Sequence, residues 1–245
     1  MPAITSKTQI LGVIGSPIEH SVSPVMHNAA IEDLGIDFRY FAFHVPVGRL
    51  EEAIKGVRAL GFAGINVTIP HKENVIGFLD EMDDTARRIG ACNTIKNDDG
   101  FLTGRNTDGE GAIQAIRAAG WKLERNNVVV IGAGGAARAI TYFLAKEVSR
   151  IVIMDIDKKR AKKLAAELEK VSRTTVIDSP VNDECLDREI AEADLLINAT
   201  PMGMFPNVDQ TPLPKKCLHE ELHVFDIVYN PLETKLIQDA KEAGC

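Results

Sequence analysis

The chain has 245 residues, 45% of them hydrophobic and 26% charged, with a formal net charge of −7 at pH 7. This length fits one large domain or two smaller ones. The charge argues against a nucleic-acid partner, and no apolar run approaches the roughly 20 residues that a membrane-spanning helix needs. Scattered cysteines indicate reduced thiols in a cytoplasmic protein and no metal site; they are Cys92, Cys185, Cys217 and Cys245.

The first hundred residues alternate between strand-like and helix-like patterns. We expect strands at 9–15, 37–45 and 63–69, helices at 23–34 and 50–60, a short helical region over 72–89, and a hairpin with arms at 93–96 and 101–106. Ser23 is the expected N-cap of the first helix, with Pro24 as its first residue. The hairpin implies a mixed sheet, and a helix over 108–119 is the candidate linker to a second domain.

The second half alternates more regularly. Strands are expected near 127–131, 150–155, 174–177, 194–198 and 223–227, with helices between most of them. This order predicts a parallel, doubly wound sheet with right-handed crossovers. The sequence therefore predicts an α/β protein with two domains: a substrate-binding and catalytic domain over 1–109 with a mixed sheet, and a Rossmann domain over 110–245.

A glycine-rich turn follows the strand expected at 127–131. It reads Gly132-Ala133-Gly134-Gly135-Ala136-Ala137, the G-x-G-x-x-A form of the dinucleotide-binding motif. Gly132 allows the tight turn, Gly134 lets the backbone approach a pyrophosphate, and the small Ala137 lets the helix pack close to the strand. Free N–H groups at the helix N-terminus then attract the phosphates. We therefore expect a dinucleotide at this turn.

Asp155 ends the next strand, about 20 residues beyond the glycine turn. An acidic residue at this place bonds the adenosine ribose hydroxyls of NAD and repels the 2′-phosphate of NADP. Lys158, Lys159 and Arg160 follow and would soften that preference. Their simpler interpretation is a solvated helix face near Glu167.

Polar side chains interrupt the strand expected at 63–69. Asn66 and Thr68 are two residues apart and so share a face, and Lys72 follows shortly after. An amide, a hydroxyl and an ammonium together suit a polyhydroxylated substrate, and a positioned lysine can exchange a proton with an alcohol that becomes a ketone. Taken alone, Lys72 is more simply a solvated lysine at a helix start.

Four further candidates also have two interpretations each. Asp108 is either a helix N-cap or a carboxylate paired with Lys72. Asn93 is either a turn residue or a substrate donor. Ser21 and Ser23 are either ordinary capping hydroxyls or, together with free N–H groups of the helix, a carboxylate site.

Two segments of the second half follow apolar strands. Residues 198–204, reading NATPMGM, would lie at the carboxyl end of a parallel strand, where ligands bind in such folds. The simpler interpretation of Met202 and Met204 is loop packing. Tyr229 follows the last strand and is either a core aromatic residue or a hydroxyl that points into a cleft.

Taken together, these segments resemble the shikimate dehydrogenase family. The resemblance runs from about Ile10 to the end of the chain and rests on motifs in the family's order: SVSPVMHNAA, GINVTIPHK, CNTI, NTDG, GAGGAARA, NATPMGM and DIVYNP. The family reversibly reduces 3-dehydroshikimate to shikimate with NAD(P), usually NADP, in chorismate and aromatic amino-acid biosynthesis.

The resemblance implies a role for each matching residue. Lys72 and Asp108 become the catalytic pair: Lys72 gives or takes the hydroxyl proton while hydride moves between nicotinamide C4 and substrate C3. Ser21 and Ser23 hold the substrate carboxylate, and its ring is contacted by Asn66, Thr68, Asn93 and Tyr229. The cofactor is implied to contact Gly132, Ala133, Gly134, Gly135, Ala136, Asp155, Thr200, Met202 and Ile227.

The sequence departs from the family at two places. NADP-dependent members mostly carry Asn-Arg-Thr after the second Rossmann strand, whereas this chain carries Asp155, Ile156 and Asp157, which predicts a shift toward NAD. The family also continues with a glycine-containing segment, a substrate-contacting Gln and a helix. No residues follow Cys245 here, so we expect that segment to be missing.

Three alternatives compete with shikimate dehydrogenase. One is an NAD-dependent quinate/shikimate dehydrogenase, against which Ser23 argues because members that favour quinate often carry Thr there. Another is a nucleotide-binding module that has lost activity. The third is a folate-type dehydrogenase, against which Ser21, Ser23 and the Asn-Thr-Asp motif argue. The expected partners are a small-molecule substrate and a second copy in a homodimer, with no nucleic acid and no membrane.

Overall fold

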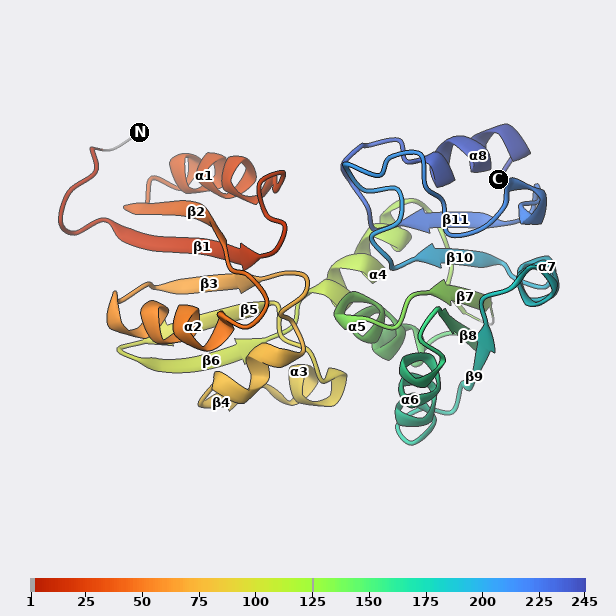
Figure 1. The fold of residues 1–245 in the computed structure, drawn as a ribbon, viewed down its shortest axis with the longest axis horizontal. Coiled ribbons are helices and arrows are strands. Elements are labelled where there is room, and N and C mark those ends of the chain that lie inside the picture. Colours follow the sequence, from red (N-terminus) through yellow and green to blue (C-terminus); the bar gives the residue numbers. More distant parts are fainter. Residues whose placement is uncertain (1–2, 125) are drawn as a thin grey trace. The chain divides into compact units, whose positions relative to one another are not determined.

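The computed structural model describes residues 3–124 and 126–245. The chain divides into two compact units between Thr107 and Asp108, each with its own sheet (Figure 1). The helix over 108–118 therefore opens the second unit. No helix in the described part of the chain is long and apolar enough to cross a membrane.

The first unit is built on a mixed sheet of six strands in the order β2-β1-β3-β5-β6-β4. The strands are β1 (Gln9–Gly15), β2 (Phe38–His44), β3 (Gly64–Val67), β4 (Glu81–Met82), β5 (Thr94–Asp98) and β6 (Phe101–Arg105). β1 pairs in parallel with β2 and β3, whereas β5 is antiparallel to both β3 and β6. The helical segments are α1 (Ser23–Asp33), α2 (Leu50–Ala59), the 3-10 helix η1 (Asn74–Phe78) and α3 (Asp84–Ile89).

The strands of this sheet bury side chains on both faces, because successive residues point to opposite sides. Ile14 of β1 packs in a cluster with Ile54 of α2. The next residue back, Val13, packs in another cluster with Ile31 of α1 and Tyr40 of β2. The two helices, α1 and α2, therefore cover opposite faces of the sheet. Polar residues that could bind a ligand are then expected at the strand ends.

Two expectations for this unit are wrong in their bounds. The strand expected at 63–69 ends at Val67, because Pro70 has no N–H to continue the ladder. The helical region expected over 72–89 is interrupted by β4, since Asp80 and Asp83 donate their backbone N–H groups to Leu102 and Gly104 at 3.1 and 3.0 Å. At this position, pairing with β6, about twenty residues further along the chain, outweighs the local sequence preference for a helix.

The second unit is a parallel sheet of five strands in the order β11-β10-β7-β8-β9. The strands are β7 (Asn127–Ile131), β8 (Arg150–Asp155), β9 (Thr175–Pro180), β10 (Leu195–Asn198) and β11 (His223–Asp226). The helices are α4 (Asp108–Ala118), α5 (Gly135–Leu144), α6 (Lys158–Glu169), α7 (Asp183–Ala191), η2 (Lys215–Cys217) and α8 (Lys235–Ala243). The predicted fold class, a mixed-sheet domain followed by a Rossmann domain, is confirmed.

Helices cover both faces of this sheet. Val128 and Val130 of β7 pack with residues of α4, α5 and α6, whereas Val129 between them packs with residues of α7 and α8. A strand that is buried on both faces has a continuous apolar sequence, as residues Val128–Ile131 do.

Gly109 sets the distance between α4 and α5. A Cβ atom added there would lie 2.3 Å from the carbonyl oxygen of Ala139 and 2.6 Å from a ring carbon of Phe143. A Cβ atom at Gly111, two residues further along the same helix, would meet nothing within 4 Å. The first glycine is required by packing, and the second is not.

Gly109→Ala should therefore lower the free energy of unfolding by about 1–3 kcal/mol, because the two helices would have to move apart. Gly111→Ala should raise it by about 0.5–1 kcal/mol, because alanine loses less backbone entropy in a helix. Urea denaturation followed by circular dichroism measures both. Equal stabilities of the two variants would contradict the packing argument.

Candidate active site

The glycine turn between β7 and α5 has the backbone that its sequence demands. Gly132 has a φ of +114°, and a Cβ atom on it would lie 2.8 Å from the carbonyl oxygen of Ala199 and 3.2 Å from Cγ2 of Thr200. Only glycine fits this close approach of two backbones. The turn and the 199–204 loop are therefore in contact.

Gly134 leaves open space in front of α5. It is the N-cap residue and has an ordinary φ of −83°. A Cβ atom on it would meet only Nη2 of Arg160, at 3.7 Å. Because glycine has no side chain to cap the helix, the N–H groups of the first turn are left to a ligand or to water. These residues fit a pyrophosphate.

Asp155 lies beside this turn, where the end of β8 places it. Its carboxylate accepts hydrogen bonds from the N–H groups of Ala133, at 2.7 Å, and Asp157, at 2.8 Å. Asp157 has a separate role that the sequence did not reveal: it is the N-cap of α6 and accepts from the N–H groups of Lys159 and Arg160. One carboxylate therefore faces the turn, and the other caps a helix.

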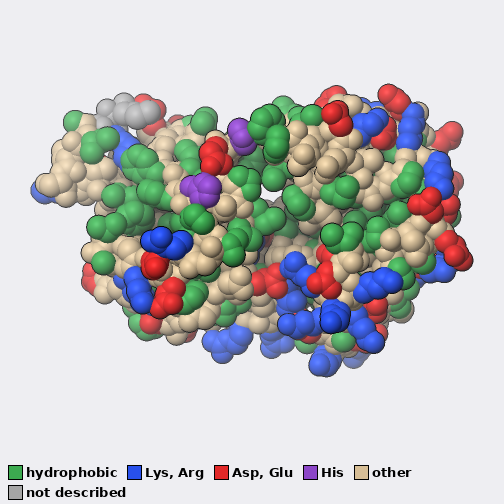
Figure 2. Space-filling model, viewed as in Figure 1, with side chains coloured by type: hydrophobic (Ala, Val, Ile, Leu, Met, Phe, Trp, Pro, Cys, Tyr) green, Lys and Arg blue, Asp and Glu red, His purple; other side chains and the backbone are tan. Residues whose placement is uncertain are grey.

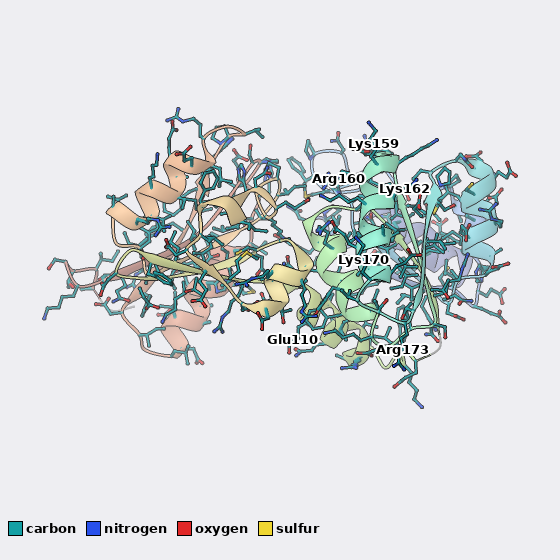
Figure 3. All side chains as sticks on the ribbon, turned by 90° about the horizontal axis from the view of Figure 1, so that it is seen from below. Glu110, Lys159, Arg160, Lys162, Lys170 and Arg173 are labelled. Atoms are coloured by element: carbon teal, nitrogen blue, oxygen red, sulfur yellow. The ribbon has the colours of Figure 1, made fainter. Side chains whose placement is uncertain are left out.

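Cations gather on α6 (Figure 2). Figure 3 shows Lys159, Arg160 and Lys162 toward the start of α6, whereas Arg173 lies beyond its other end. The guanidinium of Arg160 is the one that approaches Gly134. Arg160 is exposed, as the interpretation of a solvated helix face predicts, and its guanidinium also reaches back toward the glycine turn.

Asn198, at the end of β10, shapes the loop that follows it. This residue is fully buried. Its side-chain oxygen accepts from the N–H and the hydroxyl of Thr200, at 3.1 and 2.7 Å. Its amide donates to the carbonyl of Met202, at 3.2 Å, and to the carboxylate of Asp226, at 2.9 Å. The loop predicted to face the cofactor is thus held by a side chain beneath it.

Asp226 ends the neighbouring strand β11 and is half-buried. It also accepts from the N–H of Val228, at 3.0 Å, and from the hydroxyl of Thr234, at 2.6 Å. Burial raises the pKa of Asp226, and the hydrogen bonds from Thr234, Val228 and Asn198 partly offset that rise. The sequence analysis missed this residue, although a carboxylate that ends an apolar strand was a signal for it.

In the first unit, polar residues converge because of the sheet topology. β1 and β3 are parallel, so the segments after them lie at one edge. β5 is antiparallel to β3 and therefore begins at that edge, and β6 ends there, since Thr94 is opposite Arg105. Ser21, Thr68, Asn93 and Thr107 thus come from four segments that share this edge.

Asn66 is tied into this edge by three hydrogen bonds. Its oxygen accepts from the hydroxyl of Tyr40 at 2.6 Å, and its amide donates to the carbonyl of Asn93 at 3.2 Å and to the hydroxyl of Thr94 at 3.1 Å. Tyr40 is 3% exposed, and its ring stacks on that of His27 at 4.2 Å. Tyr40 could not be predicted from local sequence, because its partner Asn66 is 26 residues away.

Asn93 connects this edge to the end of the first unit. The residue is buried, and its side-chain oxygen accepts from the N–H of Thr107 at 3.0 Å and from the hydroxyl of Thr94 at 2.9 Å. Its amide donates to the hydroxyl of Thr107 at 3.0 Å. The carbonyl of Lys72 accepts from the N–H of Cys92, at 2.8 Å, so the Lys72 backbone lies beside the same segment.

The helix of the serine motif begins one residue earlier than expected. Val22 is the N-cap and Ser23 the first helical residue, so the predicted N-cap role of Ser23 is wrong. The hydroxyl of Ser21 accepts from the N–H of Ser23 at 3.3 Å and takes over part of that role. Both serines are half-buried.

The remaining predicted residues lie on different units. Lys72 and Thr68 belong to the first unit and are half-buried, whereas Asp108 opens α4 in the second. The pairing of Lys72 with Asp108 stays a prediction. Tyr229 belongs to the second unit and is 52% exposed, so the interpretation of Tyr229 as a core aromatic residue is wrong.

Ser16, His44 and Glu19 form a chain that resembles a hydrolase triad. Ser16 Oγ lies 3.1 Å from Nε2 of His44, and Nδ1 of His44 lies 2.9 Å from Glu19. An oxyanion would need N–H donors beside the serine. However, the Ser16 N–H bonds Ile69, Pro17 has none, and the Ile18 N–H bonds Glu19. The three side chains therefore stabilise the loop that leads to Ser21 and are not arranged as a catalytic triad.

The two units, each taken by itself, define an α/β protein that combines a dinucleotide-type Rossmann unit with a polar, substrate-type unit. Two family models match: the shikimate dehydrogenase substrate binding domain over residues 13–95, and the saccharopine dehydrogenase NADP binding domain over residues 128–245. A shikimate dehydrogenase (NADP(+)) of Methanopyrus kandleri is 45% identical over 245 residues, which are 99% of this chain and 84% of that protein.

Solved structures agree with these matches. A shikimate dehydrogenase in complex with NADP+ superposes with a TM-score of 0.89 at 42% identity, covering 99% of this chain and 84% of that one. The shikimate 5-dehydrogenase of Listeria monocytogenes, in complex with shikimate and NAD, gives 0.87 at 39% identity, covering 100% and 87%. The chain belongs to the shikimate dehydrogenase family, as its motifs predicted.

The two glycines of the turn should respond differently to alanine. Gly132→Ala should lower the free energy of unfolding by about 2–4 kcal/mol, because the new Cβ combines an unfavourable φ with a backbone clash. Gly134→Ala should stay within about 0.5 kcal/mol of the parent, since its φ is ordinary and no atom lies closer than 3.7 Å. Thermal denaturation tests this; similar losses in both variants would contradict the assigned geometry.

Proposed function

We propose that this chain catalyses the reversible reduction of 3-dehydroshikimate to shikimate with a nicotinamide dinucleotide. The observation that supports this best is the combination of two sites on one chain: a glycine turn with open space at Gly134, and a polar strand edge with Asn66, Asn93 and Lys72. Membership of the shikimate dehydrogenase family supplies the substrate class.

Residues of the Rossmann unit would hold the dinucleotide. Gly134, Gly135 and Ala136 would present N–H groups to the pyrophosphate, and Asp155 would face the adenosine ribose. Gly132 and Ala133 would line the same turn, with their own N–H groups bonded to Met154 and Asp155. Thr200, Met202 and Ile227, at the carboxyl ends of β10 and β11, would lie along the nicotinamide. When bound, this group gives or takes the hydride, while the protein orients the reactants.

Residues of the first unit would hold the substrate. Ser21 and Ser23, next to the N-terminus of α1, would bind its carboxylate. Both amide hydrogens of Asn66 are engaged, so Asn66 would accept from a ring hydroxyl through its oxygen. Thr68, Asn93 and, from the second unit, Tyr229 would contact the remaining hydroxyls.

Lys72 would exchange the proton of the reacting hydroxyl, and Asp108 would hold the ammonium in place. The half-buried position of Lys72 restricts its motion and exposes it less to competing water. Removing a positioned acid or base removes an interaction that exists mainly in the transition state.

Lys72→Ala should reduce kcat for shikimate oxidation by at least about 10²-fold, and Asp108→Asn should also reduce it strongly. Dinucleotide binding to both variants should stay near that of the parent, because neither residue is part of the glycine turn. Steady-state absorbance assays and dinucleotide fluorescence titration measure the two quantities. Lys96→Ala, which removes an exposed lysine paired with Asp98, is the matched control and should leave both unchanged; full activity of Lys72→Ala would contradict the assignment.

We also propose that NAD is preferred over NADP. The carboxylate of Asp155 is fixed beside the turn by two N–H donors, so it would repel a 2′-phosphate there. The guanidinium of Arg160 approaches the turn at Gly134 and would lessen that repulsion without removing it.

Asp155→Asn should raise kcat/KM for NADP relative to NAD by roughly tenfold, because one like-charge repulsion is removed. Arg160→Ala should shift the ratio in the opposite direction. Parallel initial-rate assays with both dinucleotides give the ratio. A parent enzyme that already favours NADP would overturn the proposed preference.

Other proposals follow from the same reasoning. Comparing kcat/KM for quinate with kcat/KM for shikimate distinguishes a quinate dehydrogenase from a shikimate dehydrogenase. A parent that binds a dinucleotide but oxidises neither acid would instead be a binding module. A cytoplasmic location and a homodimer remain proposals, the first on the basis of the free thiols.

A further inference from the structure

We propose that Asp226 is a positioning residue that holds the loops after β10 and β11 in one arrangement, so that both face the dinucleotide and the substrate correctly. The loops are residues 199–204 and 227–230, and this inference rests on the function proposed above. Asp226 is the first residue of the DIVYNP motif, but the roles implied by the family resemblance do not include this carboxylate, which lies at the strand ends where the two loops begin.

The hydrogen bonds of Asp226 reach three separate segments. One carboxylate oxygen accepts from the amide of Asn198, at 2.9 Å, and from the N–H of Val228, at 3.0 Å. The other oxygen accepts from the hydroxyl of Thr234, at 2.6 Å. Asn198 in turn holds Thr200 and Met202. A single carboxylate thus connects the first loop, the second loop and the start of α8.

Packing joins the same segments. Gly203 has a φ of +86°, and a Cβ atom on it would lie 3.4 Å from Cβ of Thr234. The N–H of Phe205 donates to the carbonyl of Asn230, at 3.0 Å. Thr234 is fully buried and also caps α8 by accepting from the N–H of Ile237. The loops can therefore shift only if this shared support changes.

The charge of Asp226 is costly, which points to a role beyond stability. Burial raises the pKa of Asp226, and the three donors named above are neutral groups. The folded chain therefore binds a proton at Asp226 more tightly than the unfolded chain does, and ionisation above the raised pKa lowers stability. By contrast, buried Asp239 on α8 is paired with the ammonium of Lys235 at 2.6 Å. A carboxylate kept at such a place accepts from more donors at once than a neutral side chain can.

Asp226→Asn separates these roles. Its oxygen can still accept from Asn198 and Val228, but its amide cannot accept from the hydroxyl of Thr234. Thr234→Val removes the same hydrogen bond from the other side, together with the side-chain cap of α8, whereas Thr234→Ser keeps both. Asp239→Asn is the matched control, because it neutralises another buried carboxylate of this unit that touches neither loop.

Two measurements on the whole 245-residue chain test the proposal. Hydrogen exchange of the backbone amides should become faster over 199–204 and 227–230 in Asp226→Asn and Thr234→Val, while β7 and β8 keep their protection. Dissociation constants for NADH, from its fluorescence, should rise roughly tenfold or more in both variants. Thr234→Ser and Asp239→Asn should bind like the parent, whatever their melting temperatures.

Parent-like loop exchange and NADH affinity in a folded Asp226→Asn or Thr234→Val would overturn the proposal. An equal loss of NADH affinity in Asp239→Asn would also overturn it, because general destabilisation of the unit would then be sufficient to explain the loss. A parent that binds NADH but does not oxidise shikimate refutes the proposed function and leaves the loop test intact. If the parent binds no dinucleotide, faster exchange confined to the two loops supports the positioning role, and unchanged exchange overturns it.

Discussion

The pairing of β7 with β10 is the constraint on which the second unit depends. Register places Asn198 opposite Ile131, so the glycine turn and the 199–204 loop leave the sheet side by side. The two backbones then approach so closely at Gly132 and Ala199 that no Cβ atom fits between them. Residues more than sixty positions apart thereby form one edge of the sheet, and neither segment has this property alone.

In the first unit, side-chain amides hold segments that are distant along the chain next to each other, whereas in the second unit glycines allow that close approach. Asn66 and Asn93 each bond more than one segment, so the ends of β3 and β6 and the start of β5 are fixed relative to each other. A buried polar network of this kind is rigid when all its groups are satisfied. Such rigidity suits a substrate whose hydroxyl groups differ mainly in position.

Charge has different functions at three places in the second unit. Asp155 is fixed by N–H donors at the glycine turn, Asp157 caps α6, and the half-buried Asp226 holds two loops together. Of these three carboxylates, only that of Asp157 has an ordinary stabilising role, as a helix cap. The other two place negative charge beside the glycine turn or where partial burial disfavours it, which is typical of sites shaped by function at some cost in stability.

The sequence by itself determined the α/β class, the parallel second sheet, the glycine turn and the family, because these depend on local periodicity and on short motifs. It also located the helix after Ser21, although not its cap. It could not show that β4 interrupts the region over 72–89, that Tyr40 bonds Asn66, or that Asp226 supports the 199–204 loop. Those contacts join residues distant along the chain, and only strand order and register bring them together.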